Sequence, residues 1–248
     1  MNDRRVALVT GAAGGLGAAC SIRLAEDGIA IGVLDIDEQR CAATVKTIED
    51  AGGQAVVLGA DVSDRTQVAA AVDTLRAAFG PVTIAVNNAG VVDFSPLEDV
   101  TDELFHHVYG VNVLGPFLVT QAVLPDMKAA GWGRVVNISS SSAQTGAPNM
   151  SVYASSKGAI ISLSRSLAQE LGPLGITVNT IPPGTISGTV MSGKRMSDER
   201  NTEFAKGLPV RRIGVPDDIA NACAWLCSEA SSYVTGQIIG VNGGRVVT

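Results

Sequence analysis

The chain has 248 residues, enough to bury a sizeable core in one large α/β domain or in two small domains. Apolar residues make up 46% of the chain and charged residues only 17%, a balance that favours strands covered by helices on both faces. The formal net charge of −6, without a cluster of Lys or Arg, argues against a nucleic-acid partner or an anionic membrane surface. No apolar run approaches the roughly 20 residues that a membrane span needs, so we expect a cytoplasmic protein.

Seven aliphatic runs of strand length alternate with amphipathic, helix-like stretches. They are Val6–Val9, Ala30–Leu34, Ala55–Gly59, Ile84–Asn87, Arg134–Ile138, Thr177–Ile181 and Gln237–Val241. This alternation predicts an α/β fold with an open, mostly parallel, doubly wound sheet and helices on both faces. No linker-like tract divides the chain, and we expect one domain over residues 1–248.

The turn after the first strand is rich in glycine and leads into a helical pattern. Its backbone and the N-terminus of that helix can receive a pyrophosphate, because glycine lets the chain turn tightly and approach the ligand closely. The candidate contacts are Gly11, Gly14, Gly15, Leu16 and Gly17. A plain strand-to-helix turn is the alternative, but the position at the first crossover favours dinucleotide binding.

Asp35 ends the second strand, 18 residues after Gly17, where a carboxylate can accept hydrogen bonds from the hydroxyls of an adenosine ribose. A 2′-phosphate there would meet a like charge, and neither Gly14 nor the neighbouring Ile36 supplies a basic group to bind it. The sequence therefore predicts NAD(H) rather than NADP(H) as the cofactor. The alternative is that Asp35 is only an exposed acid at a strand end.

Tyr153 and Lys157 lie four residues apart in a later helical pattern and so share one helix face. A phenol ordinarily has a pKa of about 10, and a nearby ammonium group lowers that pKa toward the range useful for proton transfer. An ordinary pair of helix-surface residues is the alternative.

The cysteines do not form a metal-site pattern. Cys223 and Cys227 are one helical turn apart, but neither a second Cys pair nor a His follows at zinc-ligand spacing. With Cys20 and Cys41 they are predicted to be buried, unreactive thiols. The chain has only two histidines, which are adjacent, and we expect no metal site.

In their order and spacing, the glycine-rich turn, the Asn-Asn-Ala-Gly sequence at 87–90, Ser140 and the Tyr-x-x-x-Lys motif resemble the short-chain dehydrogenase/reductase family. The resemblance covers essentially the whole chain and includes secondary-alcohol dehydrogenases and 3-oxoacyl-[acyl-carrier-protein] reductases. It implies a Rossmann-type fold and hydride transfer between a nicotinamide and a secondary alcohol or its ketone, without a metal. It also implies a homotetramer that binds a small-molecule substrate.

By the same resemblance Tyr153 is the general acid/base, assisted by Lys157. Ser140, thirteen positions before Tyr153, is then the serine that binds the substrate oxygen, with Ser139 as its main rival in a run of four serines. Asn112 is implied to hold a water in a proton relay. The alternative for Asn112 is a buried amide that only satisfies backbone groups.

The resemblance also implies further cofactor contacts. They are Asp61 and Val62 beside the adenine, Asn88, Ala89 and Gly90 beside the adenosine ribose, and Pro183, Gly184 and Ile186 beside the nicotinamide. Asn88 is equally suited to bracket neighbouring strands. The family often has threonine four positions after the glycine of this Pro-Gly turn, whereas this chain has Gly188 followed by Thr189.

The substrate pocket is expected to include Val91 to Phe94, Ser141 to Asn149 and a mobile substrate-loop segment at 185–209. These largely apolar walls favour a hydrophobic alcohol or ketone. A reductase of 3-oxoacyl groups on acyl carrier protein is the competing enzymatic interpretation, and a cofactor-binding regulator without chemistry is the alternative of another class. The basic residues that leave docking of an acidic carrier open are Lys194, Arg195, Arg200, Arg211 and Arg212.

Overall fold

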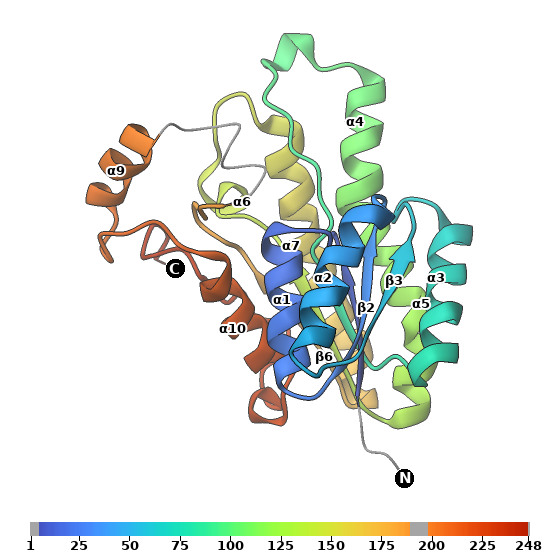
Figure 1. Cartoon of the computed structure of the whole chain (residues 1–248). Helices are drawn as coiled ribbons and strands as arrows, with labels where there is room; N and C mark the ends of the chain where they lie inside the picture. The colour runs from blue at the N-terminus through green and yellow to red at the C-terminus, as the bar shows by residue number, and fades with distance from the viewer. Residues whose placement is uncertain (1–4, 189–197, 248) are drawn as a thin grey trace.

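The structure, a computed structural model, describes residues 5–188 and 198–247 (Figure 1). Six parallel strands form one sheet in the order β3-β2-β1-β4-β5-β6. Their bounds are β1 Val6–Thr10, β2 Ala30–Asp35, β3 Ala55–Gly59, β4 Ile84–Asn87, β5 Gly133–Ile138 and β6 Ile176–Ile181. The strand order reverses between β1 and β4, and in such sheets the ligand crevice opens at the carboxyl ends of the strands beside that reversal.

The prediction of a seventh strand at 237–241 is wrong in detail. This segment lies along β6, where isolated parallel bridges join Thr180 to Ile238 and Pro183 to Val241. Two consecutive prolines follow β6 directly and have no N–H group to donate, so a regular ladder cannot continue there. The segment therefore lies beside β6 at the sheet edge without forming a regular strand.

Helices cover both faces of the sheet, as predicted (Figure 1). Their bounds are α1 Gly15–Glu26, α2 Glu38–Asp50, α3 Arg65–Phe79, α4 Asp102–Tyr109, α5 Gly115–Ala130, α6 Ser142–Thr145, α7 Ser151–Leu171, α9 Asp198–Gly207 and α10 Pro216–Leu226, with a π-helical turn, η2, at Gly110–Leu114. Helices α1, α2 and α10 pack on one face, and α3, α5 and α7 pack on the other.

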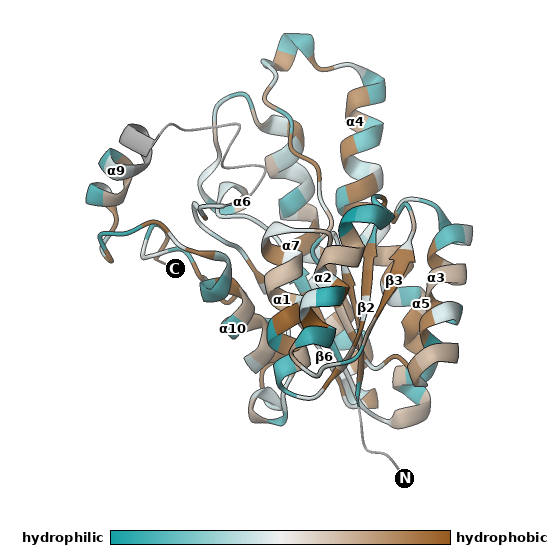
Figure 2. Ribbon diagram, viewed as in Figure 1, coloured by the Kyte–Doolittle hydropathy of each residue, from teal (hydrophilic) through white to brown (hydrophobic). Residues whose placement is uncertain are grey.

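Successive strand residues enter opposite cores, which explains why the strands are apolar throughout. Ala7 and Val9 belong to the core under α1, whereas Val6 and Leu8 belong to the core under α3. Figure 2 shows the strands as hydrophobic and the outer helix faces as mixed or hydrophilic. All four cysteines are buried as free thiols in the core under α1, which confirms that part of the sequence prediction.

Helices α4 and α5 and the turn between them run without interruption from Asp102 to Ala130. This stretch contains an 18-residue window with a mean hydropathy of 1.3, so by length and composition alone the helix could cross a membrane, contrary to the expectation from the sequence. Val119, Val123 and Met127, however, are fully buried between the sheet and its neighbouring helices. The apolar composition of α5 is thus used in the protein core.

The segment at 185–209, for which the sequence shows little hydrophobic periodicity, contains a helix, α9. Residues 189–197 lie outside the described part of the chain. Directly after α9, Leu208 is buried, and Pro209 packs so closely on Gly244 that an added Cβ there would lie 2.7 Å from the proline ring. The C-terminal tail is therefore packed against the residues that follow α9. A substrate-loop role for 185–209 stays a prediction.

Candidate active site

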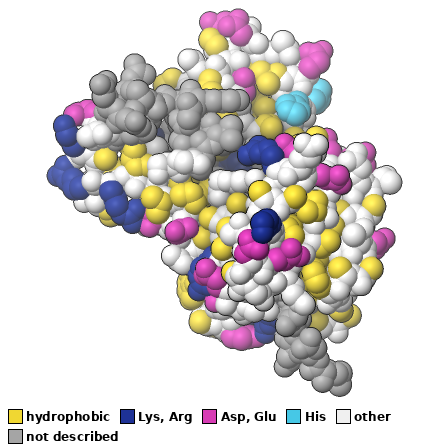
Figure 3. All heavy atoms as spheres, viewed as in Figure 1, with side chains coloured by type: hydrophobic (Ala, Val, Ile, Leu, Met, Phe, Trp, Pro, Cys, Tyr) yellow, Lys and Arg dark blue, Asp and Glu magenta, His cyan; other side chains and the backbone are white. Residues whose placement is uncertain are grey.

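A cleft of about 590 Å³ opens at the carboxyl ends of the strands (Figure 3). It brings together nearly all of the residues singled out from the sequence. Those that line it are Gly11, Gly14, Gly15, Leu16, Asp35, Ile36, Asp61, Val62, Asn88, Ala89, Gly90, Ser140 and its rival Ser139, Tyr153, Lys157, Pro183, Gly184 and Ile186. Gly17 and Asn112 are the two site candidates that do not line it. The walls also include Val91, Val92, Ser141, Ser142 and Ala147 from the predicted substrate pocket. The other members of the predicted stretches, Asp93, Phe94, Ala143 to Gly146, Pro148 and Asn149, do not line it.

The glycine turn is shaped for close packing and for an anion. Gly11 has a φ of +63°, and a Cβ on Gly17 would lie 2.2 Å from the Gly11 carbonyl oxygen, so both positions require glycine. Asn88 donates from Nδ2 to the carbonyl oxygens of Thr10 and Gly11, at 2.9 and 3.0 Å. Gly17 and Asn88 therefore hold the backbone of the turn in its shape. The N–H groups at the N-terminus of α1 have no side-chain cap, so they are available to bind a pyrophosphate.

Asp35 is fixed beside this turn. Its Oδ2 accepts a hydrogen bond from the Ala13 N–H, and its Oδ1 accepts one from the Asp37 N–H, both at 3.2 Å. The carboxylate is thus oriented at the end of β2 and keeps lone pairs for ribose hydroxyls. Together the uncapped helix, the glycine turn and Asp35 fit a dinucleotide whose adenosine lies at the β2 end of the cleft.

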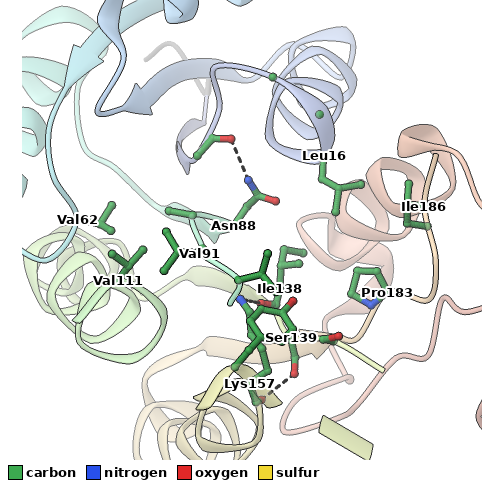
Figure 4. A pocket seen from close by; sticks show the side chains of 18 of the residues that line it. Leu16, Val62, Asn88, Val91, Val111, Ile138, Ser139, Lys157, Pro183 and Ile186 are labelled. Carbon is green, nitrogen blue, oxygen red and sulfur yellow. Dashed lines mark hydrogen bonds between the residues drawn. The ribbon is translucent and has the colours of Figure 1, made fainter. Parts of the chain in front are cut away.

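Aliphatic side chains form two walls around the middle of the cleft. Figure 4 shows Val62, Val91 and Val111 on one side and Leu16, Pro183 and Ile186 on the other, with Asn88 between them. The carboxylate of Asp61 accepts hydrogen bonds from the Ser63 N–H and hydroxyl, at 2.8 and 2.7 Å. The two aliphatic walls form an apolar slot between them in which a flat ring can lie.

Lys157 and Tyr153 lie deep in the cleft on one face of α7. Lys157 is only 4% exposed, and its Nζ donates to the carbonyl oxygen of Ile138 at 2.9 Å (Figure 4). That Nζ lies 6.0 Å from the centroid of the Tyr153 ring. Burial lowers the pKa of Lys157 from 10.5 to about 8, because a charged ammonium is poorly solvated there. A buried cation beside a phenol favours the phenolate, which is the property that a proton-transferring tyrosine needs.

The serine run separates into two roles. The Ser139 hydroxyl donates to the carbonyl oxygen of Lys157 at 2.8 Å and is buried. Ser140 Oγ instead accepts hydrogen bonds from the N–H and hydroxyl of Ser142, at 3.2 and 2.9 Å. The hydroxyl proton of Ser139 is therefore committed to the backbone, while that of Ser140 can be donated to a ligand in the cleft.

Alanine at Ser140 is expected to lower kcat about 100-fold, because the substrate oxygen loses a hydrogen-bond donor where negative charge develops. Alanine at Ser139 is expected to lower it less than about tenfold, because that hydroxyl bonds to a neutral carbonyl. Steady-state turnover of the two variants measures the difference. A larger loss in Ser139→Ala than in Ser140→Ala would contradict the assignment.

Asn112 lies behind the cleft, in the π-helical turn between α4 and α5, and is fully buried. Its Nδ2 donates to the Val91 carbonyl and the Ser156 hydroxyl, both at 3.0 Å, and its Oδ1 accepts from the Val91 N–H at 2.9 Å. The side chain thus braces the cleft wall at Val91, as in the alternative considered from the sequence. A part in a proton relay stays a prediction.

The cleft also contains charged side chains that the motifs did not indicate. Arg40 lines it from α2, with a guanidinium nitrogen 3.0 Å from where a Cβ on Gly14 would lie. Arg245 lines it from the C-terminal tail. Neither belongs to a recognisable motif, and only the packing of α2 and of the tail reveals their positions.

Comparison with known proteins agrees with this geometry. A family model described as enoyl-(acyl carrier protein) reductase matches residues 11–245, which include the glycine turn, the serine run and the Tyr-x-x-x-Lys motif. The chain belongs to the short-chain dehydrogenase/reductase family. Members of this family are oxidoreductases, and the chain is therefore an enzyme acting on a CH–OH group.

Relatives within the short-chain dehydrogenase/reductase family act on different substrates. An L-2,3-butanediol dehydrogenase of Corynebacterium glutamicum is 38% identical, covering 98% of each chain. A 3-oxoacyl-[acyl-carrier-protein] reductase of Thermotoga maritima is 35% identical, covering 99% of each chain. A gluconate 5-dehydrogenase from Burkholderia cenocepacia, solved with NADP and tartrate, superposes with a TM-score of 0.90 at 33% identity, covering 97% of this chain and 94% of its own. Family membership therefore fixes the reaction class but not the substrate or the cofactor.

Proposed function

We propose that this enzyme transfers a hydride between NAD(H) and a secondary alcohol or ketone with a largely apolar body. The observation that carries the proposal is the meeting of Ser140, Tyr153 and Lys157 in the same cleft as the glycine turn and Asp35. When bound, the nicotinamide supplies the hydride acceptor or donor.

The protein side chains manage the proton and the substrate oxygen. In the direction of oxidation, the Tyr153 phenolate takes the hydroxyl proton of the alcohol as the carbinol carbon loses hydride. Ser140 donates a hydrogen bond to the same oxygen and orients it. Lys157 favours the phenolate through its charge and would contact the ribose next to the nicotinamide. Reduction of a ketone runs through the same groups in reverse.

The test is a panel of secondary alcohols and ketones assayed with both cofactors by the absorbance of the reduced nicotinamide. Turnover of apolar members with NAD(H) supports the proposal. Binding of cofactor without turnover of any member would favour the non-catalytic alternative. Turnover confined to 3-oxoacyl groups on acyl carrier protein would favour the carrier-dependent reductase.

Two of the five basic residues that leave docking of an acidic carrier open are already engaged within the chain. Arg211 donates to the carbonyl oxygen of Lys206. Arg212 forms a two-point ion pair with Asp218, at 2.6 and 2.7 Å, that also holds the start of α10. Lys194 and Arg195 lie outside the described residues, and the side chain of Arg200 is likewise not described. The relative from Thermotoga maritima is the main support for this alternative.

The preference for NAD(H) rests on Asp35, since its carboxylate would face the 2′-phosphate of NADP(H). In Asp35→Asn, we expect the ratio of kcat/KM with NADP to that with NAD to rise about tenfold or more, because the like charge is removed. Glu49→Gln removes the same charge from the exposed far end of α2 and should leave the ratio unchanged. A wild-type enzyme that already prefers NADPH would contradict the assignment and point to Arg40 as the phosphate ligand.

A homotetramer is part of the proposal. Three large apolar side chains on α4, η2 and α5 are exposed in the single chain, Phe105 at 41%, Leu114 at 44% and Phe117 at 39%. Exposed apolar groups of this size on one continuous helix suit a helix-to-helix interface between subunits.

A further inference from the structure

Ser140 differs in exposure from the other serines of its run. Ser139, Ser141 and Ser142 are buried, whereas Ser140 is partly exposed. All of them line the cleft. Of these residues, Ser140 is therefore the most accessible to a ligand, and the surroundings of its hydroxyl decide how well it can donate a hydrogen bond.

The turn that contains Ser140 is fixed through its backbone. The Ser141 N–H donates to the carbonyl oxygen of Pro183, directly after β6, at 2.9 Å. The chain then turns into α6, and the Ala143 N–H donates to the Ser140 carbonyl oxygen at 3.0 Å. These hydrogen bonds restrict where the side chains of Ser140 and Ser142 can lie.

Ser142 donates two hydrogen bonds to one atom, the Oγ of Ser140. Its backbone N–H lies 3.2 Å from that oxygen, and its own hydroxyl oxygen lies 2.9 Å away. A serine hydroxyl has one proton to donate and two lone pairs to accept with. Because Ser142 occupies both lone pairs, the Ser140 proton is left to point in the remaining direction. Ser142 thereby makes Ser140 a donor toward the cleft that Ser140 lines.

The hydrogen bond from the Ser142 hydroxyl is expected to strengthen during the reaction. Negative charge develops on the substrate oxygen, and Ser140 donates to that oxygen. A hydroxyl that donates strongly becomes more negative at its own oxygen, so a second donor to that oxygen is attracted more strongly. Ser142 is buried, and little water competes for this bond.

We propose that Ser142 is a positioning residue that acts through Ser140. Its hydroxyl orients the Ser140 proton toward the substrate oxygen and supports the charge that develops there. The inference rests on the proposed hydride transfer and adds to that site a side chain that no motif indicated. The backbone N–H of Ser142 makes its hydrogen bond whatever the side chain, so only the hydroxyl bond depends on the residue type.

The first test removes the Ser142 hydroxyl. In Ser142→Ala we expect kcat to fall about five- to tenfold, because one hydrogen bond to Ser140 is lost and the other remains. KM and the dissociation constant of NADH, measured by fluorescence, should stay within about twofold, because the hydroxyl is committed to Ser140. Ser142→Thr keeps a hydroxyl at this position and should restore kcat to within about threefold of the wild type.

The decisive test places Ser142→Ala in a Ser140→Ala background. A residue that acts only through the Ser140 hydroxyl has nothing to act on there, so the second substitution should change kcat by less than about twofold. A residue that contacts the substrate itself, or only supports the fold, would cost the same in both backgrounds. Single-turnover kinetics with saturating cofactor measures kcat even in the slow variants.

Ser155→Ala is the matched control for loss of a serine hydroxyl. Ser155 lies on α7, where its hydroxyl donates to the Val152 carbonyl oxygen at 2.9 Å, and it does not line the cleft. This variant should retain the wild-type kcat. Urea denaturation of Ser142→Ala and Ser155→Ala compares their stability with that of the wild type.

Three outcomes would overturn the inference: wild-type kcat in Ser142→Ala, equal losses in the wild-type and Ser140→Ala backgrounds, or weaker NADH binding as the main effect of Ser142→Ala. Failure of the proposed function would look different. In that case the wild type would turn over no alcohol or ketone of the panel with either cofactor.

Discussion

Replacement of Tyr153 by phenylalanine is expected to lower kcat about 1,000-fold or more while the dissociation constant of NADH stays within about twofold of the wild-type value. The substitution removes only the phenol oxygen, and general acid/base catalysis by such a group contributes about 10²–10⁴-fold. Tyr153 is 4% exposed and lines the cleft, so the ring keeps its packing. The measurement is single-turnover and steady-state kinetics with a substrate found in the panel.

A matched control is available in Tyr109→Phe. The Tyr109 hydroxyl donates to Ser155 Oγ at 3.0 Å, also on α7, but Tyr109 does not line the cleft. This variant loses the same atom in the same neighbourhood and should retain turnover within about threefold. Comparable activity of Tyr153→Phe and Tyr109→Phe would show that the proton is carried by another group.

Lys157→Met is expected to produce opposite effects on activity and on stability. Turnover should fall about 100-fold or more, because the Tyr153 phenol loses the cation that favours its ionised form. The fold should become more stable at pH 7, because a buried ammonium is replaced by an apolar chain of similar length. Burial lowers the pKa of Lys157 from 10.5 to about 8, and each tenfold change in proton affinity is about 1.4 kcal/mol. The variant also loses the hydrogen bond from Lys157 to the Ile138 carbonyl, which is worth about 1 kcal/mol. When this loss is subtracted, the free energy of unfolding is expected to rise by about 2 kcal/mol.

The pH dependence of this gain has a defined sign. Below about pH 8 Lys157 is protonated in both the folded and the unfolded chain, and the full desolvation penalty is present. Between about 8 and 10.5 the unfolded chain binds more protons, so the stability of the wild type rises with pH relative to Lys157→Met. The difference between the two proteins should therefore shrink across that window.

Urea denaturation of the cofactor-free proteins at about pH 7 and about pH 10, at one protein concentration, measures this difference. Lys206→Met, at an exposed lysine, should show no such pH-dependent difference from the wild type. A Lys157→Met variant that is less stable than the wild type at about pH 7 would contradict the view that the buried charge weakens the fold.

Local sequence patterns were sufficient for the fold class and for the central catalytic candidates. Strands buried on both faces read as aliphatic runs, and the glycine turn, Asp35 and the Tyr153–Lys157 pair are each defined by short spacings along the chain. Parallel strands in a doubly wound sheet end at one edge, so residues that follow different strands had to meet there. The Tyr153–Lys157 pair and the glycine turn accordingly line one cleft.

Packing between distant segments settled the remaining features, because it depends on side-chain geometry that spacing does not encode. The hydroxyl of Ser139 faces the Lys157 carbonyl, which distinguishes it from Ser140. The buried amide of Asn112 is bonded to the backbone of Val91 and does not itself line the cleft. Arg245, near the end of the chain, reaches the cleft because Asn242 and two glycines shape its turn. Contacts across such long sequence separations arise only when the chain is folded, and they place charge where no motif indicates it.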